Sequence, residues 1–288
     1  MTTHSRPARP DRRFTALYRN NLEQVGPADI VLAGYGGAGQ SIIANALLEL
    51  RLNYVDPYTE LLHEDGSTSH VTDHAGFRSR MAALHARDTG TGRRVPERPW
   101  PRFFKTHLPP EVFPRRVGGL WLVVRDPRDA LHSWYQWRKN FAEVDWDRVR
   151  GDFGQFLREA DHSGRRPAAD WAYFYSEWLR YGEGLDRMVC TRFEDVKSDP
   201  LPVLRDALRS LGLVIPDDAV AAAIRRSSFD AMRAHEDKVA AGGPGGPARM
   251  MRRGKVGEWQ EWMTPKLAGY LSDDAFVAVA RQFGYSIG

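Results

Sequence analysis

The chain has 288 residues, of which 42% are hydrophobic and 27% charged, with a formal net charge of +4. This balance is typical of a folded soluble protein; no apolar run approaches the roughly 20 residues of a membrane-spanning helix, and the N-terminus lacks the apolar stretch of a secretory signal. The single cysteine, Cys190, excludes an internal disulfide framework and favours the cytoplasm, and no Cys/His cluster has the spacing of a zinc site, so no metal is expected.

The first 27 residues are polar and rich in arginine, with no sustained hydrophobic period. They are predicted to form a flexible tail or a loosely docked arm. An arm that binds nucleic acid is an alternative, but arginine-rich tails are more often simply solvated, so nucleic acid is not among the expected partners. The rest of the chain, residues 28–288, is predicted to be one domain.

The first expected strand covers residues 29–33, a short apolar run typical of a buried parallel strand. It leads into a glycine-rich loop, residues 34–41, and then into an expected helix over residues 42–50. The order of strand, glycine loop and helix is typical of the start of a nucleotide-binding α/β domain.

Two further apolar runs, residues 119–124 and 188–193, are predicted to be strands. Helices are expected after the first of them, from Pro127 onward, and over residues 168–181, 201–211, 217–225 and 272–283. Alternating strands and helices predict an α/β fold with a central, mostly parallel sheet flanked by helices, of the P-loop-like nucleotide-binding type. Glycines and prolines over residues 240–250 predict a loop that is mobile until nucleotide binds.

Three segments carry residues suited to chemistry on an anionic group. In the glycine loop, backbone amides could cradle a phosphate at the start of the following helix, although Gln40 stands where a P-loop has its lysine. A tight structural turn is the alternative. Lys105 and His107 flank one threonine, and they could supply a positive charge and a proton acceptor. The alternative is a structural histidine.

The third segment begins at Arg125, which follows a predicted strand. Carboxyl ends of parallel strands are where α/β sheets bind ligands. Ser133 lies eight residues later, about two helical turns along, so that an arginine and a hydroxyl could share one phosphate. A salt bridge at the end of the strand is the alternative.

Five segments, in this order, resemble motifs of the cytosolic sulfotransferase family, in its bacterial form with small-molecule acceptors. Residues 105–109 are similar to the KTHLP signature, and residues 125–133 to the segment that binds the 3′-phosphate of the donor. Residues 193–195 resemble the YED segment, whose aromatic ring lies near the adenine. The resemblance covers roughly residues 28–265 and is completed by Trp171 and Trp178, similar to a pair of tryptophans in the family, and by residues 251–259, similar to its RKG…GDW element.

The resemblance implies a sulfotransferase fold and transfer of a sulfuryl group from 3′-phosphoadenosine 5′-phosphosulfate (PAPS), with PAP as the product. It implies His107 as general base and Lys105 as the cation that stabilises the transferring group and the leaving phosphate. The residues that it assigns to the donor site are Gly37, Ala38, Gly39, Gln40, Ser41, Arg125, Ser133, Phe193, Arg252, Arg253 and Gly254.

The chain departs from the family pattern at two places. In the first loop, which in the family reads close to YPKSGTTW, the lysine position holds Gly37 and the tryptophan position holds Ile42. Lys105 and the basic loop at residues 252–255 could compensate for the missing charge. The family's dimer motif is also altered, with Gln260, Pro265 and Gly269 at three of its positions, so that the family's mode of dimerisation is not expected and the oligomeric state stays open.

The expected acceptor is a hydroxyl of a small molecule, such as a secondary metabolite. Aromatic residues suggest a ring-bearing or amphipathic acceptor, but such residues more often belong to the core. Two other functions remain open: a nucleotide phosphotransferase with the same fold, and a nucleotide-binding protein with weak catalysis.

Overall fold

The computed structural model describes residues 16–70, 93–141, 149–161, 163–241 and 251–287 of the chain. Among these residues, no helix is both long and apolar enough to cross a membrane. No group of three or more His, Cys, Asp or Glu side chains in the same part of the chain is arranged to hold a metal ion.

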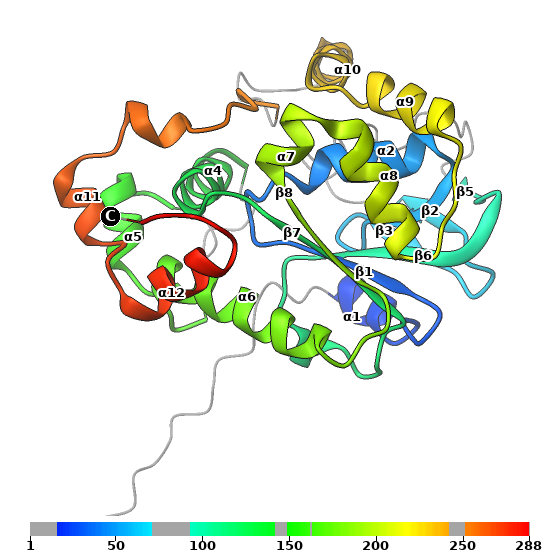
Figure 1. The fold of residues 1–288 in the computed structure, drawn as a ribbon, viewed down its shortest axis with the longest axis horizontal. Coiled ribbons are helices and arrows are strands. Elements are labelled where there is room, and N and C mark those ends of the chain that lie inside the picture. The colour runs from blue at the N-terminus through cyan, green and yellow to red at the C-terminus, as the bar shows by residue number, and fades with distance from the viewer. Residues whose placement is uncertain (1–15, 71–92, 142–148, 162, 242–250, 288) are drawn as a thin grey trace, which may run out of the picture.

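A five-stranded sheet forms the centre of the molecule (Figure 1). Its strands, in spatial order, are β2 (Leu52–Val55), β6 (Arg98–Thr106), β1 (Ile30–Ala33), β7 (Gly119–Val124) and β8 (Met188–Arg192). Every neighbouring pair is parallel. The predicted α/β fold with a central parallel sheet is therefore confirmed.

Helices cover both faces of this sheet, as Figure 1 shows. The helices α2 (Gln40–Glu49), α8 (Pro200–Ser210) and α9 (Asp217–Arg226) enclose one apolar cluster, to which β1 contributes Ile30 and Leu32. The helices α1 (Ala16–Leu22), α6 (Pro167–Gly182) and α12 (Asp274–Gln282) enclose the other, to which β1 contributes Val31 and Ala33. Because successive side chains of a strand point to opposite faces, a strand buried on both faces is apolar throughout.

The remaining elements lie around this core. A small antiparallel sheet consists of β3 (Glu60–Leu62), β4 (Thr68–His70) and β5 (Arg93–Arg94). The other helices are η1 (Pro110–Val112), α4 (Pro127–Phe141), α5 (Phe153–Arg158), α7 (Phe193–Ser198), α10 (Phe229–Ala241), η2 (Glu258–Glu261) and α11 (Pro265–Gly269).

The N-terminal segment differs from the predicted tail in its second half. Residues 16–22 form α1, whose Tyr18 and Leu22 lie one helical turn apart and are both buried. The Tyr18 hydroxyl hydrogen-bonds the Thr106 hydroxyl at 2.7 Å. The predicted boundary at residue 28 therefore falls too late, because the packed structure begins by Ala16; residues 1–15 lie outside the described residues.

Two strands of the sheet, β2 and β6, are absent from the sequence-based prediction. β2 carries a polar Asn53, and β6 starts with two prolines, Pro99 and Pro101, so neither matches the pattern of a buried strand. The predicted mobile loop at residues 240–250 lies almost wholly outside the described residues. Helix α10 extends to Ala241, and the mobility of the residues after it stays a prediction.

The parallel strands deliver several polar segments to one edge of the sheet. The glycine loop follows β1, His107 follows β6 and Arg125 follows β7. Asp56 follows β2, and Phe193 follows β8. In open α/β sheets the ligand site lies beyond this carboxyl edge, so the topology brings together the segments that the sequence singles out.

Candidate functional site

The glycine loop lies close against two neighbouring elements. Gly37 and Gly39 have φ of 84° and 85°, in the left-handed region that favours glycine. A Cβ added at Gly37 would lie 2.3 Å from the carbonyl oxygen of Ala130 in α4, and one at Gly39 would lie 2.3 Å from the ring of Phe193. Glycine is therefore required at both positions by conformation and by space.

The loop leads directly into the N-terminus of α2. Gly39 is its N-cap, and no side chain caps this end, so the first amides of the helix, those of Gln40 and Ser41, are suited to an anionic group, whereas the amide of Ala38 donates to the carbonyl oxygen of Tyr35 at 3.0 Å. The Gln40 side chain turns the other way: its amide nitrogen donates to the carbonyl oxygens of Leu32 at 2.9 Å and Thr106 at 3.3 Å. Within the loop, Gln40 can therefore meet an anion through its backbone rather than its side chain.

His107 lies beside this loop with its ring orientation fixed. Its Nδ1 is 2.7 Å from the carbonyl oxygen of Gly34, which can only accept a hydrogen bond, so Nδ1 carries the proton. In the neutral ring Nε2 is then the basic nitrogen. Tyr58 stacks on the imidazole at 5.8 Å between centroids, and Trp134 lies at 6.4 Å. This arrangement suits a histidine that accepts a proton.

Lys105 forms an ion pair that the sequence did not suggest. Its Nζ lies 2.9 Å from Oδ2 of Asp56, the residue that follows β2. The lysine side chain is 15% exposed and that of Asp56 is 2% exposed. Asp56 and Lys105 are far apart in the sequence, and only the parallel pairing of β2 with β6 brings them together.

Arg125 is the most enclosed of the predicted donor-site cations. Its guanidinium donates to the carbonyl oxygens of Gly37 at 3.3 Å and Lys255 at 2.8 Å, and lies 4.6 Å above the ring of Phe193. Burial lowers the pKa of Arg125, and Asp129 partly offsets this effect. Its Nε is buried without a hydrogen-bond partner among the described residues. An anionic ligand could provide the missing hydrogen-bond acceptor for this buried, positively charged donor.

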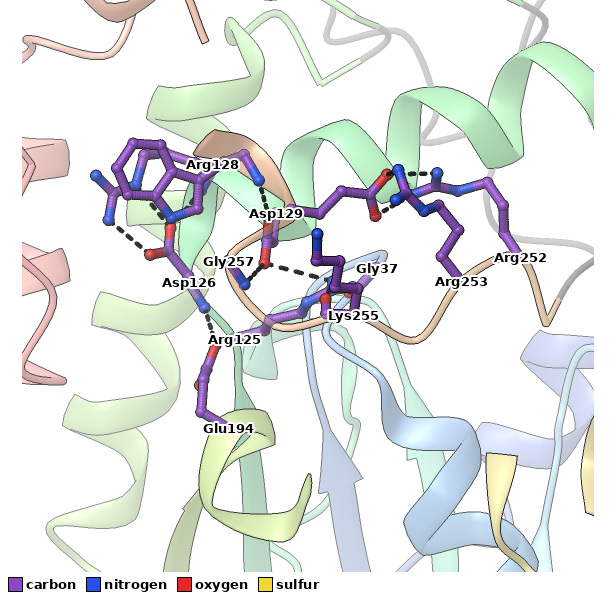
Figure 2. A network of polar contacts seen from close by, with 12 residues as sticks. Gly37, Arg125, Asp126, Arg128, Asp129, Glu194, Arg252, Arg253, Lys255 and Gly257 are labelled. Carbon is purple, nitrogen blue, oxygen red and sulfur yellow. Dashed lines mark hydrogen bonds and ion pairs between the residues drawn. The ribbon is translucent and has the colours of Figure 1, made fainter. Parts of the chain in front are cut away.

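Asp129 connects helix α4 to the loop before η2, as Figure 2 shows. Its carboxylate accepts hydrogen bonds from the backbone amides of Gly257 at 2.9 Å and Trp259 at 2.7 Å, and lies 3.5 Å from Arg125. Arg128 adds a second connection, because its guanidinium lies 3.5 Å above the Trp259 ring. The basic loop at residues 252–255, which leads into Gly257 and η2, is thus connected to the segment that carries Arg125.

The cations of this loop are paired with carboxylates of η2 (Figure 2). Arg252 makes a two-pronged pair with Glu258, with both N–O distances at 2.6 Å. Arg253 lies 2.7 Å from Glu261, which also binds Lys255. These side chains place positive charge near α4, and Gly254, with φ of 58°, turns the chain between them.

Ser133 and Phe193 complete the predicted donor site. Ser133 lies on α4, and its Cβ would lie 3.0 Å from a Cβ added at Gly37, so the serine is adjacent to the glycine loop. Phe193 begins α7 and is placed between Gly39 and Arg125. Of the predicted donor-site residues, Arg125, Ser133 and Phe193 therefore lie against the loop that follows β1, whereas Arg252 and Arg253 pair with carboxylates of η2 and Gly254 lies against the Phe229 ring.

His132 lies behind this site, stacked on Trp262 at 4.5 Å between ring centroids. Burial, and then the charge of Arg252, lowers its pKa to about 4. A histidine with a depressed pKa in the folded state binds its proton more tightly when unfolded, so stability falls as the pH drops below about 6.5.

We expect thermal unfolding to show this dependence directly. Between pH 7.5 and pH 5 the wild type should lose about 1 kcal/mol of stability through His132, after allowance for solvent screening. The variant His132→Phe, which keeps an aromatic ring on Trp262, should lose less over the same interval. An identical loss in both proteins would assign the acid sensitivity to other groups.

Comparison with known proteins identifies the family. The sulfotransferase domain family matches residues 27–280. The chain belongs to this family. Cytosolic sulfotransferase 16 of Arabidopsis thaliana is 26% identical over 57% of this chain and 53% of its own length, and human sulfotransferase 6B1 is 25% identical over 81% of this chain and 70% of its own length. The match thus spans about half of the plant relative.

Solved sulfotransferase structures share the fold. A mouse sulfotransferase, SULT7A1, crystallised with PAP, superposes with a TM-score of 0.61 at 18% identity, covering 93% of this chain and 90% of its own. Retinol dehydratase in a complex with retinol and PAP gives 0.59 at 16% identity, covering 92% of this chain and 84% of its own. These structures confirm the sulfotransferase fold.

Within this sulfotransferase fold, sequence reasoning missed three acidic residues at the site: Asp56, Asp129 and Glu258. Asp129 lies in the same segment as Arg125 and Ser133. Its position four residues after Arg125, one helical turn along, is the sequence signal that indicates an ion pair between them. Asp56 directly follows β2, a strand that the sequence did not reveal. Glu258 was read only as part of a motif, although a carboxylate so close to Arg252 suggests a pair.

Proposed function

We propose that this protein transfers a sulfuryl group from PAPS to a hydroxyl group of a small-molecule acceptor, such as a secondary metabolite, in the cytoplasm. Membership of the sulfotransferase family supports the reaction class. The observation that carries the proposal is the hydrogen bond of His107 Nδ1 with the Gly34 carbonyl oxygen at 2.7 Å. It leaves Nε2 as the basic nitrogen of His107 beside the glycine loop, against which Arg125, Ser133 and Phe193 also lie.

The residues present fit a nucleotide with two anionic ends. For the 5′-group, the site offers the backbone of residues 37–41 at the uncapped end of α2, with the Lys105 ammonium on the neighbouring strand. For the 3′-phosphate it offers Arg125, whose Nε has no partner among the described residues, together with Ser133. Arg252, Arg253 and Gly254 would act with these residues, and the Phe193 ring would face the adenine.

When bound, PAPS would supply the sulfuryl group, and PAP would leave as the bond between sulfur and the 5′-phosphate oxygen breaks. His107 would accept the acceptor's hydroxyl proton at Nε2 while its Nδ1 stays bonded to Gly34. The charge of Lys105 would stabilise the negative charge on the transferring group. Fixed hydrogen-bond donors and a positioned base suffice for a single displacement at sulfur, because the protein contributes mainly the orientation of the reactants and electrostatic stabilisation.

Addition of PAP is expected to raise the melting temperature of the protein. A hundredfold excess over the dissociation constant contributes about 2.7 kcal/mol of stability, which for a chain of this size corresponds to about 5–10 °C. Arg125→Ala should abolish most of this shift. Scanning calorimetry with and without PAP measures it.

Arg180→Ala serves as the matched control, because the Arg180 side chain is 68% exposed on α6 and its ion pair among the described residues is a local one with Glu177. Arg128 is unsuitable as a control, since its guanidinium packs on the Trp259 ring of η2. The absence of any shift at millimolar PAP would remove the donor assignment. Stabilisation by ATP in preference to PAP would favour a phosphotransferase, and PAP binding without turnover of PAPS would favour a binding protein.

A further inference from the structure

The Asp56 carboxylate is held firmly in place. Its Oδ1 accepts a hydrogen bond from the amide of Tyr58 at 3.2 Å, and its carbonyl oxygen accepts the amides of Thr59 and Glu60. Helix α1 supports the same turn, because Asn21 donates to the carbonyl oxygens of Pro57 at 3.2 Å and Glu60 at 2.7 Å. The carboxylate therefore cannot follow Lys105 if the ammonium moves.

The ion pair draws Lys105 toward one side of the site. In the sheet, β6 lies between β2 and β1, and the glycine loop follows β1. The Lys105 ammonium binds Asp56, which follows β2, on the side of β6 opposite to that loop. A group held at the glycine loop and the carboxylate of Asp56 thus approach the same ammonium from different sides.

The charge of Lys105 matters more here because the glycine loop has none. Residues 34–41 carry no charged side chain, and Gly37 occupies the position of the family's lysine. The nearest buried guanidinium, that of Arg125, is already bonded to the carbonyl oxygens of Gly37 and Lys255. A carboxylate 2.9 Å from Lys105 offsets its charge and also repels an anion bound nearby.

We propose that Asp56 is a positioning residue that holds Lys105 by its ammonium, so that this carboxylate and the 5′-group of the nucleotide compete for one cation. The inference rests on the proposed function, because it takes the nucleotide to be PAP or PAPS. As a consequence, the site should bind the product PAP more weakly than it would without the Asp56 carboxylate, which favours release of PAP.

The test is a thermodynamic cycle of PAP binding, measured by titration calorimetry, for which no acceptor is needed. The four proteins are the wild type, Asp56→Asn, Lys105→Ala and the double variant. Asparagine has the shape of aspartate and keeps an oxygen for the Tyr58 amide. Asp56→Asn should bind PAP about tenfold more tightly than the wild type, and the same substitution in the Lys105→Ala protein should gain no more than about twofold.

A purely structural role for Asp56 predicts the opposite sign, since a disturbed turn would weaken PAP binding. Unchanged or weaker binding by a folded Asp56→Asn protein would overturn the inference. An equal gain in both backgrounds would overturn it as well, because the carboxylate would then act by its charge alone and not through Lys105. Where Asp56→Asn melts far below the wild type, Asp56→Ser, whose hydroxyl can accept the Tyr58 amide, repeats the cycle. A wild type that binds no PAP would instead remove the donor assignment itself.

Discussion

Replacement of His107 by alanine is expected to lower turnover by about a hundredfold or more, the usual contribution of positioned proton transfer. PAP affinity should stay nearly unchanged, because in the proposed mechanism the basic Nε2 serves the acceptor and not the nucleotide. The measurement pairs kcat for PAPS-dependent transfer with PAP titration of the same protein. Lys105→Ala should differ by lowering turnover and weakening donor binding together, since its charge acts on both.

His107→Gln is the matched control for the structural role of this side chain. Its amide can donate to the Gly34 carbonyl oxygen as Nδ1 does, but it has no basic nitrogen, so it should be as inactive as the alanine variant. Recovery of activity in His107→Gln would show that the hydrogen bond to Gly34, and not proton transfer, is what the site needs. A loss of activity that only parallels a loss of stability would have the same meaning.

Gly37→Lys, which places a lysine at the position that the motif resemblance aligns with the family's loop lysine, is expected to damage the protein rather than improve it. A left-handed backbone costs a residue with a side chain roughly 1–2 kcal/mol, and the Cβ would also lie 2.3 Å from the carbonyl oxygen of Ala130. We expect the free energy of unfolding to fall by about 3–5 kcal/mol in total, with loss of the stabilisation by PAP. Denaturant unfolding and PAP titration measure the two effects.

Gly164→Lys separates the two causes of this effect. Gly164 has a similar φ of 77°, but no atom of the described residues beyond its chain neighbours lies within 4 Å of its added Cβ. Its substitution should therefore show only the backbone contribution, about 1–2 kcal/mol. If Gly37→Lys proved as mild as Gly164→Lys and bound PAP more tightly, the loop would have to shift away from α4, and the close packing of Gly37 would not explain the missing lysine.

Strands and helices were predictable where one physical signal dominated. β1 and β7 were found because short apolar runs mark strands that are covered on both faces, and β8, an edge strand that is only partly buried, was found from its short apolar start. β2 and β6 were missed because polar residues and prolines interrupt them, and the pairing between them is a tertiary property. Helix α1 was missed because only Tyr18, Asn21 and Leu22 face the core, too few to produce a period in an arginine-rich segment.

The predicted site residues came from local motifs, and their assembly follows from the parallel sheet. What the sequence could not reveal was how their charges are balanced. Asp56 meets Lys105 only through the pairing of two strands, and Asp129 meets Gly257 across more than a hundred residues. Such contacts depend on the fold as a whole, whereas a motif specifies only its own residues.

Helix α1 precedes the part of the chain that the sulfotransferase family shares, which begins at residue 27. Nevertheless, its Tyr18 bonds Thr106, which lies between Lys105 and His107, and its Asn21 supports the turn after Asp56. A segment outside the shared motifs therefore contacts the Thr106 side chain, between the proposed catalytic residues Lys105 and His107, and the backbone of the turn after Asp56. Substitutions in this flanking helix could therefore change the positions of Thr106 and Asp56 at the carboxyl edge of the sheet, without any change in the residues that resemble the family motifs.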